Sequence, residues 1–256
     1  MSDILVHTEA GVMTLTFNRP NKKNSITGAM YGVLAEALEQ AAQDAAVRVV
    51  VIQGNVAVFS AGNDIGDFLN MPSSGTGEER PSTGFMYALT NFPKPVIAAV
   101  CGPAVGIGTT LLLHCDLVYA GDNAAFSVPF VNLGLCPEFA SSLLLPQMFG
   151  AHRAAEALLL GEPFMAEAAL EIGLVNRVLP PSEVNAYAQA QARKLAAKPL
   201  SALIETKRLL RKTQGQAVLD RIAEEKQSYA RMLPAPAARE AFTAFLEKRK
   251  PDFSQY

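Results

Sequence analysis

Short apolar segments alternate with amphipathic ones through the first half of the chain. Alternating or continuous apolar residues predict strands at 12–18, 47–53 and 96–100. Apolar positions at helical spacing predict a helix over 30–45, with Ser25 or Thr27 as its N-cap. Strands and helices that alternate in this way indicate an α/β core.

The second half of the chain is mainly helical in pattern. It predicts one further strand, at 174–179, and helices at 182–197, 199–212, 215–232 and 236–248. Pro199 and Gly215 separate three of these helices. We therefore expect a core that holds the site, residues 1–198, and a helical C-terminal region, residues 199–256. This region packs either on its own core or on a neighbouring chain.

Two glycine-containing turns carry the pattern of a binding site. GPAVGIG, at 102–108, follows a predicted strand, and its glycines let backbone approach a ligand closely. FSAGNDI, at 59–65, also places small residues between a strand and a helix, where the first helical N–H groups lack partners and attract anionic oxygen. Either turn alone is more often a tight connection than a site.

The segment PEFASS, which follows the second turn, contains one carboxylate. Glu138 belongs to the segment PEFASS and follows Pro137 at a predicted helix start. A glutamate in that position interacts favourably with the helix dipole, which is a purely structural role. The same dipole would favour the ionised form of its carboxyl group. Residues 69–84 are rich in Pro, Ser and Gly and predict a surface loop that forms a wall or lid of the site.

Composition and charge argue against several classes of function. The 256 residues carry a net charge of −2 without a basic cluster, so no nucleic-acid surface is indicated. No apolar run approaches the length of a membrane span, and the N-terminus lacks signal-peptide features, which makes a cytoplasmic location the default. The cysteines lack metal-ligand spacing and are expected to be reduced, with no metal site: Cys101, Cys115 and Cys136.

Several familiar catalytic motifs are absent. Gly106-Ile107-Gly108 is not followed by the third glycine of a dinucleotide fingerprint, no GK[ST] follows a glycine as in a phosphate loop, and VFSAGN is not a nucleophile elbow. The three histidines lie in dissimilar contexts and are expected on the surface or in packing: His7, His114 and His152.

The order of motifs resembles the crotonase family, also called the enoyl-CoA hydratase and isomerase superfamily. The resemblance covers nearly the whole chain and rests on TLTFNRPNKKNSI, VFSAGNDI, KPVIAAVCGPAVGIG, CDLVYA, FSVPFVNLGLCPE and EKRKPDF. It implies a spiral of ββα units, a helical C-terminal trimerisation region, assembly as a homotrimer or dimer of trimers, and an acyl-CoA thioester substrate. No other cofactor is implied, because coenzyme A enters as part of the substrate.

The resemblance also assigns roles to residues. It places the two backbone N–H groups of an oxyanion hole on Asn63 and Ile107, where they would stabilise negative charge on the thioester oxygen. It implies substrate contacts at Ala61, Gly62, Asp64, Ile65, Gly106, Gly108 and Lys22. For Asp64, capping of the following helix competes with a substrate role. Arg19, Lys22, Lys23, Lys248 and Lys250 either meet CoA phosphates or are solvated surface charges.

The residues at two positions decide which reaction the resemblance favours. Hydratases of the family carry glutamates where this chain has Thr110 and Phe130, and neither of these can move a proton at neutral pH. Glu138 instead resembles the single catalytic glutamate of peroxisomal-type Δ3,Δ2-enoyl-CoA isomerases, which serve the oxidation of unsaturated fatty acyl chains. The alternatives are another family isomerase or lyase, a hydratase-like enzyme, or a non-catalytic acyl-CoA-binding protein.

Overall fold

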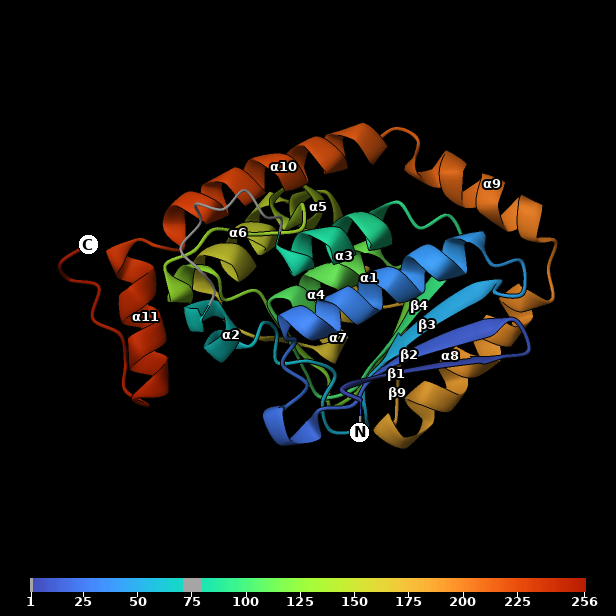
Figure 1. Ribbon diagram of the computed structural model, residues 1–256, viewed down its shortest axis with the longest axis horizontal. Helices are drawn as coiled ribbons and strands as arrows, with labels where there is room; N and C mark the ends of the chain where they lie inside the picture. The colour runs from blue at the N-terminus through green and yellow to red at the C-terminus, as the bar shows by residue number, and fades with distance from the viewer. Residues whose placement is uncertain (1, 71–79) are drawn as a thin grey trace.

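The computed structural model describes residues 2–70 and 80–256 and has a six-stranded mixed sheet at its centre (Figure 1). The order is β1-β2-β3-β4-β6-β9, and only β1 and β2 pair antiparallel. The strands are β1 (Ile4–Glu9), β2 (Val12–Phe17), β3 (Val49–Gln53), β4 (Val96–Val100), β6 (Leu117–Gly121) and β9 (Arg177–Leu179). The predicted α/β class is therefore confirmed.

Alternate residues of the central strands face two different helical layers. Val49 and Val51 pack with the buried face of α8 (Pro181–Ala196), whereas Val50 and Ile52 belong to the larger core beneath α1 (Gly28–Gln43). A strand places successive side chains on opposite faces, so one continuous apolar run serves both layers. Figure 1 shows α1 and α3 (Pro81–Thr90) side by side on one face of the sheet.

A second, three-stranded sheet includes part of the segment 102–108, which the sequence predicted as a turn. Its order is β5-β7-β8, with β5 (Pro103–Val105), β7 (Ala125–Ser127) and β8 (Phe164–Met165). The prediction for 102–108 was a turn alone, but its middle residues extend and pair in parallel with β7. β1 was not predicted at all; five of its six residues are exposed, so no buried alternation marks it.

The remaining helices are mostly short. They are α2 (Ile65–Asn70), α4 (Ile107–Thr110), α5 (Ser141–Phe149), α6 (Ala151–Leu160) and α7 (Ala166–Glu171), with 3-10 turns at η1 (Pro20–Lys22), η2 (Leu111–His114) and η3 (Val131–Leu133). The predicted loop at 69–84 is wrong at both ends, because Leu69 and Asn70 end α2 and 81–84 begin α3. Pro81 occupies the first turn of α3, where its missing N–H costs nothing. Residues 71–79 lie outside the described ranges.

The C-terminal helices are α9 (Leu200–Arg211), α10 (Gly215–Met232) and α11 (Pro236–Leu246). Figure 1 shows α9 and α10 arching over the layer that contains α3 and α5. Val218, Ile222 and Phe242 join the main core cluster of the chain. The C-terminal helices therefore share the main core with residues 1–198 rather than forming a separate core of their own.

A buried ion pair fastens α9 to the sheet. Lys207 Nζ lies 2.7 Å from Asp116 Oδ2 and donates to the Lys94 carbonyl oxygen at 2.7 Å, and the Lys207 side chain is only 8% exposed. Arg211 also binds Asp116, at 2.9 Å.

Lys207→Met is expected to lower the free energy of unfolding by on the order of 3 kcal/mol, because it removes a buried donor from the Lys94 carbonyl and from the half-buried Asp116 carboxylate. Chemical denaturation measures this change. Lys212→Met, at an exposed position one residue past α9, is the matched control and is expected to change stability little. Equal effects of the two substitutions would contradict the role given to Lys207.

Candidate active site

Two isolated parallel bridges bring the predicted oxyanion turns together. Ser60 pairs with Ala104 of β5, and Ile26 pairs with Asn63. Ser60 donates its N–H to the Pro103 carbonyl and its carbonyl accepts from the N–H of Val105, at 3.0 and 2.9 Å. The segments 59–65 and 102–108, far apart in sequence, thus become neighbours.

Glycine is required where the turns touch. A Cβ added at Gly62 would lie 2.6 Å from the Val105 carbonyl oxygen, and the φ of Gly62 is +85°. A Cβ at Gly108 would lie 2.9 Å from the Ser60 carbonyl oxygen. Both distances are shorter than a van der Waals contact, so the approach of the two backbones depends on these two residues. Gly106 is also left-handed, with φ +56°, and precedes Ile107.

The N–H groups of Asn63 and Ile107 both remain available at this junction. Ile26 bonds to Gly62 O and Asp64 N, on either side of Asn63, so the N–H of Asn63 itself faces away from that bridge. Ile107 opens α4, where an N–H precedes any intrahelical acceptor. Within 2–70 and 80–256 neither N–H has a hydrogen-bond acceptor. Two N–H groups at one junction, without acceptors in the described chain, are compatible with the oxyanion hole that the resemblance implies, which stays a prediction.

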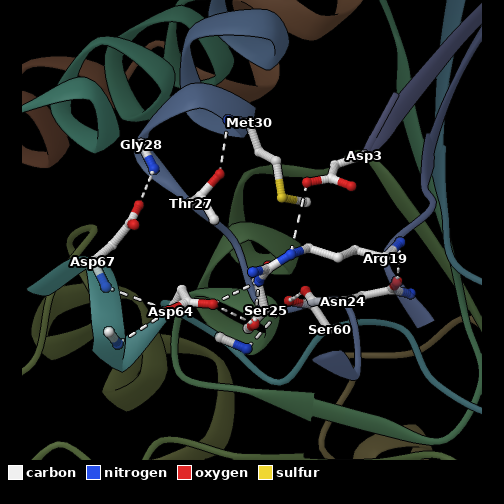
Figure 2. A network of polar contacts seen from close by, with 12 residues as sticks. Asp3, Arg19, Asn24, Ser25, Thr27, Gly28, Met30, Ser60, Asp64 and Asp67 are labelled. Carbon is white, nitrogen blue, oxygen red and sulfur yellow. Dashed lines mark hydrogen bonds and ion pairs between the residues drawn. The ribbon is translucent and has the colours of Figure 1, made fainter. Parts of the chain in front are cut away.

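A polar network fixes the chain on the other side of the first turn (Figure 2). Arg19 Nη1 donates to Asp64 Oδ2 at 2.6 Å and to Ser25 Oγ at 2.8 Å, and Ser25 Oγ donates to the same carboxylate oxygen at 3.0 Å. Buried Asn24 donates to the carbonyls of Val58 and Phe59. Arg19 is therefore occupied in holding the turn.

Asp64 also caps the next helix. Its Oδ1 accepts from the N–H of Gly66 at 3.0 Å and of Asp67 at 3.3 Å, at the start of α2. Burial would raise the pKa of Asp64, but hydrogen bonds from Arg19 and Ser25 outweigh it and hold the pKa below its usual range. The capping interpretation agrees with these contacts, and the carboxylate has no capacity left over for a second role.

The other predicted contact residues divide into two groups. Ala61 and Ile65 lie in the first turn and at the start of α2, where the N–H of Ala61 donates to Lys23 O at 2.9 Å. Both are partly buried and stand beside the oxyanion donors. Lys22, in contrast, is exposed at the end of η1, and its side chain contacts none of the described site residues.

Glu138 does not begin a helix, which corrects the prediction. α5 starts only at Ser141, because Phe139 and Ala140 adopt left-handed backbone with φ of 61° and 56°. Pro137 and the polar residues after it suggested a helix start, but the intervening turn separates Glu138 from the helix dipole. The argument that the dipole favours the ionised base is therefore wrong.

Burial dominates the chemistry of Glu138 instead. The residue is 8% exposed, and its Oε1 has no hydrogen-bond partner within the described part of the chain. Burial raises the pKa of Glu138 to about 8, the Glu225 carboxylate adds to the increase, and Arg80 and the Asn63 side chain partly offset it. A carboxyl group with this pKa can both accept and return a proton near neutrality.

Any turnover that uses Glu138 as its base is expected to rise with pH through about 8 and to level off above it, since a base acts in its ionised form. The measurement is kcat/KM between pH 6 and 9.5, with circular dichroism at each pH as the control for folding. An acid limb centred below pH 5 would mean that Glu138 behaves as an ordinary exposed carboxylate.

The two positions of the missing glutamates are filled by groups that cannot transfer protons at neutral pH. Thr110 is fully buried in α4, and its hydroxyl has no partner among the described residues. Phe130 is 4% exposed, and its ring lies 3.9 Å from the position of a Cβ at Gly106. Glu138, by contrast, is a buried carboxyl group that interacts with the side chain of Asn63 in the first turn.

Sequence reasoning missed several groups that surround Glu138. Tyr31 donates a hydrogen bond to Asn63 Oδ1, and Tyr31, Asn63 and Arg80 line the same small cavity. Burial raises the pKa of Tyr31 and of Tyr229 well above the usual range, with a further increase from Glu138, so both phenols stay protonated. Of these groups, only Glu225 could have been noticed in the sequence, because a glutamate stands there on the otherwise apolar face of α10. The buried residues of that face are Val218, Ile222, Glu225 and Tyr229.

His114 has the packing role that was predicted for it. Its ring stacks on Phe139 with centroids 3.8 Å apart, and Nε2 lies 2.8 Å from the Phe139 carbonyl oxygen. Burial lowers the pKa of His114 to about 3, so the ring is neutral and donates through Nε2. No cluster of three metal-ligand side chains occurs in the described ranges, and none of the helices there is long and apolar enough to cross a bilayer.

An α/β core in which two backbone turns abut and a buried glutamate interacts with the side chain of Asn63 is compatible with the crotonase type of acyl-thioester enzyme. Comparison with known proteins agrees: the family described as Enoyl-CoA hydratase/isomerase matches residues 7–256. The chain belongs to the enoyl-CoA hydratase/isomerase family and has its crotonase fold. The family resemblance is confirmed, and an acyl-CoA thioester substrate fits it.

Individual relatives point to more than one reaction. The 2,3-dehydroadipyl-CoA hydratase of Escherichia coli (strain K12) is 36% identical over 254 residues, which cover 99% of each chain. Enoyl-CoA delta isomerase 2 of Rattus norvegicus is 40% identical over 219 residues, which cover 83% of this chain and 55% of that protein. The solved structure of OdaA from Pseudomonas aeruginosa has a TM-score of 0.92 at 50% identity, covering 96% of this chain and 99% of that one.

Proposed function

We propose that this protein is a Δ3,Δ2-enoyl-CoA isomerase. The observation that carries the proposal is the arrangement at Glu138: one buried carboxylate beside the two free N–H groups, with Thr110 and Phe130 where a hydratase pair would stand. The similarity to a delta isomerase is consistent with it. Addition of water requires an activated water and an acid, whereas migration of a double bond requires a single base that returns its proton.

The reaction follows from these groups. Ionised Glu138 removes a proton from C2 of a 3-enoyl thioester, and the electron pair moves into a dienolate whose oxygen accepts from the N–H groups of Asn63 and Ile107. Glu138 then returns the proton at C4, which leaves the double bond at C2 in the trans product. The electron count is unchanged, so the reaction needs no redox cofactor, and coenzyme A takes part only as a portion of the substrate.

Placement of the proton-accepting group in an apolar pocket has a chemical purpose. A buried carboxylate is a stronger base than a hydrated one, and the C2 proton of a thioester is a weak acid. The oxyanion donors act as the negative charge develops, which lowers the barrier rather than the ground state. The left-handed turn after Glu138 keeps the carboxyl group out of the helix, where the dipole would have weakened its basicity.

A hydratase on a dicarboxylic thioester is the second candidate, because the relative with matching length carries that name. The test is to incubate the purified protein with 3-hexenoyl-CoA and, in parallel, with 2-hexenoyl-CoA. Isomerisation that is much faster than hydration supports the proposal. Faster hydration would overturn it in favour of a hydratase-like enzyme, and tight binding without turnover of either substrate would favour a non-catalytic binder.

The proposal includes assembly as a homotrimer or a dimer of trimers. Large apolar side chains remain exposed on the C-terminal helices, on α9 and at the end of α11: Leu209, Leu210, Phe245 and Leu246. Exposed apolar groups of this size commonly mark a surface that another chain covers. Light scattering coupled to gel filtration distinguishes a trimer or hexamer from a monomer of 27.3 kDa.

A further inference from the structure

We propose that Glu225 is a positioning residue for the base: its carboxylate holds the turn after Glu138 and sets a fixed negative charge beside it. The inference rests on the proposed function, because it assigns Glu138 as the base. Glu225 belongs to α10, in the C-terminal helical region, and nothing in the sequence motifs of the family resemblance includes it.

The turn after Glu138 needs to be held. Phe139 and Ala140 are consecutive residues with positive φ, and neither is glycine, so each is strained relative to an ordinary backbone conformation. Such a pair persists only when surrounding contacts fix it. Both residues are buried, at 1% and 0% exposure, so water cannot supply those contacts.

Glu225 supplies them on one side. Its Oε2 accepts from the N–H of Ala140 at 2.6 Å, and its Oε1 accepts from the N–H of Ser142 at 2.9 Å. Glu225 is 6% exposed and reaches the turn from 85 residues further along the chain. Both oxygens are occupied by N–H donors at the start of α5, where a carboxylate also meets the positive end of the helix.

His114 fixes the other side of the turn. Its Nε2–H donates to the Phe139 carbonyl, and its Nδ1 accepts from Thr90 Oγ1 at 3.2 Å. The turn is therefore held between a neutral ring and a carboxylate. The carboxylate is required by geometry, because glutamine has only one acceptor oxygen and would turn an NH₂ group toward the second N–H.

The charges that face the two glutamates determine the electrostatic effect. Glu138 is faced by the positive charge of Arg80 and by the negative charge of Glu225. The phenols of Tyr31 and Tyr229 are neutral. Burial raises the pKa of Glu225, and the bonds at Ser142 and Ala140 and the charge of Arg221 oppose the increase. Two N–H donors on one carboxylate favour its ionised form. Burial also raises the pKa of the Cys136 thiol, which keeps it neutral. Ionised Glu225 then strengthens Glu138 as a base.

The experiment compares Glu225→Gln with Glu225→Asp, and both with Asp220→Asn. Asp220 is an exposed carboxylate on the same helix, so its substitution is the matched control. The readouts are the pH of half-maximal kcat/KM on the acid limb and the rate of C2 proton exchange of butanoyl-CoA in D₂O. The exchange reports on the base even when no double bond migrates.

Glu225→Gln is expected to move the acid limb to lower pH by on the order of one unit, since one like charge is removed. The plateau rate is expected to fall about tenfold or more, as the base is weaker and the turn less well held. Glu225→Asp keeps the charge but is one methylene too short to satisfy both N–H groups. It is expected to lower the rate with the acid limb near its wild-type position, and Asp220→Asn to change neither.

Failures of the two proposals are distinguishable. An acid limb of Glu225→Gln at the wild-type pH would overturn the inference about Glu225. If Glu225→Gln does not fold, Glu225→Asp decides: wild-type rate in that variant would overturn the positioning role. Glu138→Gln tests the proposed function separately, because isomerisation and exchange that survive this substitution remove Glu138 as the base whatever Glu225 does.

Discussion

Glu138→Gln is expected to lower kcat for isomerisation by about 10² to 10⁴, the usual contribution of one general base, and at the same time to make the protein more stable. The two effects have one origin. The carboxyl group is buried, Oε1 has no partner in the described residues, and Glu225 repels its charge. The same surroundings that make Glu138 a strong base also destabilise its ionised form in the folded protein.

The sign of the stability change follows from the pKa shift. The pKa of Glu138 is about 8 in the fold and near 4.5 in an unfolded chain, so the folded state loses stability as pH rises from 4.5 to 8. The penalty reaches about 3 kcal/mol at pH 7 and about 5 kcal/mol above pH 8. Glutamine cannot ionise and avoids it. The difference between variant and wild type is expected to vanish near pH 4.5.

Thermal or chemical unfolding at pH 5, 7 and 9 measures this dependence, alongside the isomerisation assay. Glu39→Gln, an exposed position on α1, is the matched control and is expected to change neither activity nor stability appreciably. A Glu138→Gln protein that is less stable than wild type at pH 7 would contradict the electrostatic account. It would indicate that the carboxylate is there for structural reasons.

Gly62→Ala is expected to lower kcat by about 10² to 10³, close to the effect of losing one oxyanion donor. The added Cβ would lie 2.6 Å from the Val105 carbonyl oxygen, at a φ of +85° that side chains disfavour. The two turns must then separate or rotate. Because the N–H groups of Asn63 and Ile107 act only when aimed at one oxygen, a shift of a few tenths of an ångström disrupts the pair.

Gly32→Ala provides the comparison for this substitution. Gly32 lies in α1, and a Cβ there would meet no atom within 4 Å, so alanine is expected to stabilise the helix by up to about 1 kcal/mol without affecting catalysis. The predicted loss at Gly62 appears in kcat more than in KM, since charge develops on the oxygen during reaction. Unchanged kcat in Gly62→Ala would show that the donors do not depend on this contact.

Strands and helices could be predicted from the sequence where a single local pattern of apolar residues marked them. The strand at 96–100 matches β4, and the helix at 215–232 matches α10, because unbroken apolar runs and amphipathic spacing are local signals. Thr27 caps α1, accepting from the Met30 N–H at 3.3 Å. β1 was not predicted, because only one of its six residues is buried and its sequence therefore shows no alternation of apolar and polar positions.

The motifs of the candidate site could be recognised in the sequence, but the backbone conformation and the electrostatics around Glu138 could not. The two turns and Glu138 were found from residue types, yet the sequence suggested a helix start where the chain instead takes a left-handed turn. The conformation of Phe139 and Ala140 depends on Glu225 and His114, which are far away in the sequence and come into contact with this turn only in the folded chain. The raised pKa of Glu138 was beyond reach for the same reason.

Contacts between segments far apart in the sequence also govern when the candidate site can form during refolding. Ser60 Oγ donates to the Asn24 carbonyl 36 residues earlier, and Glu225 reaches Ala140 across 85 residues. Closing such loops costs entropy before any contact compensates for it, so these links form after local helices. On dilution from denaturant, helical signal is expected to return first, and turnover only when the distant segments have met. Activity is thus a late and sensitive marker of the completed fold.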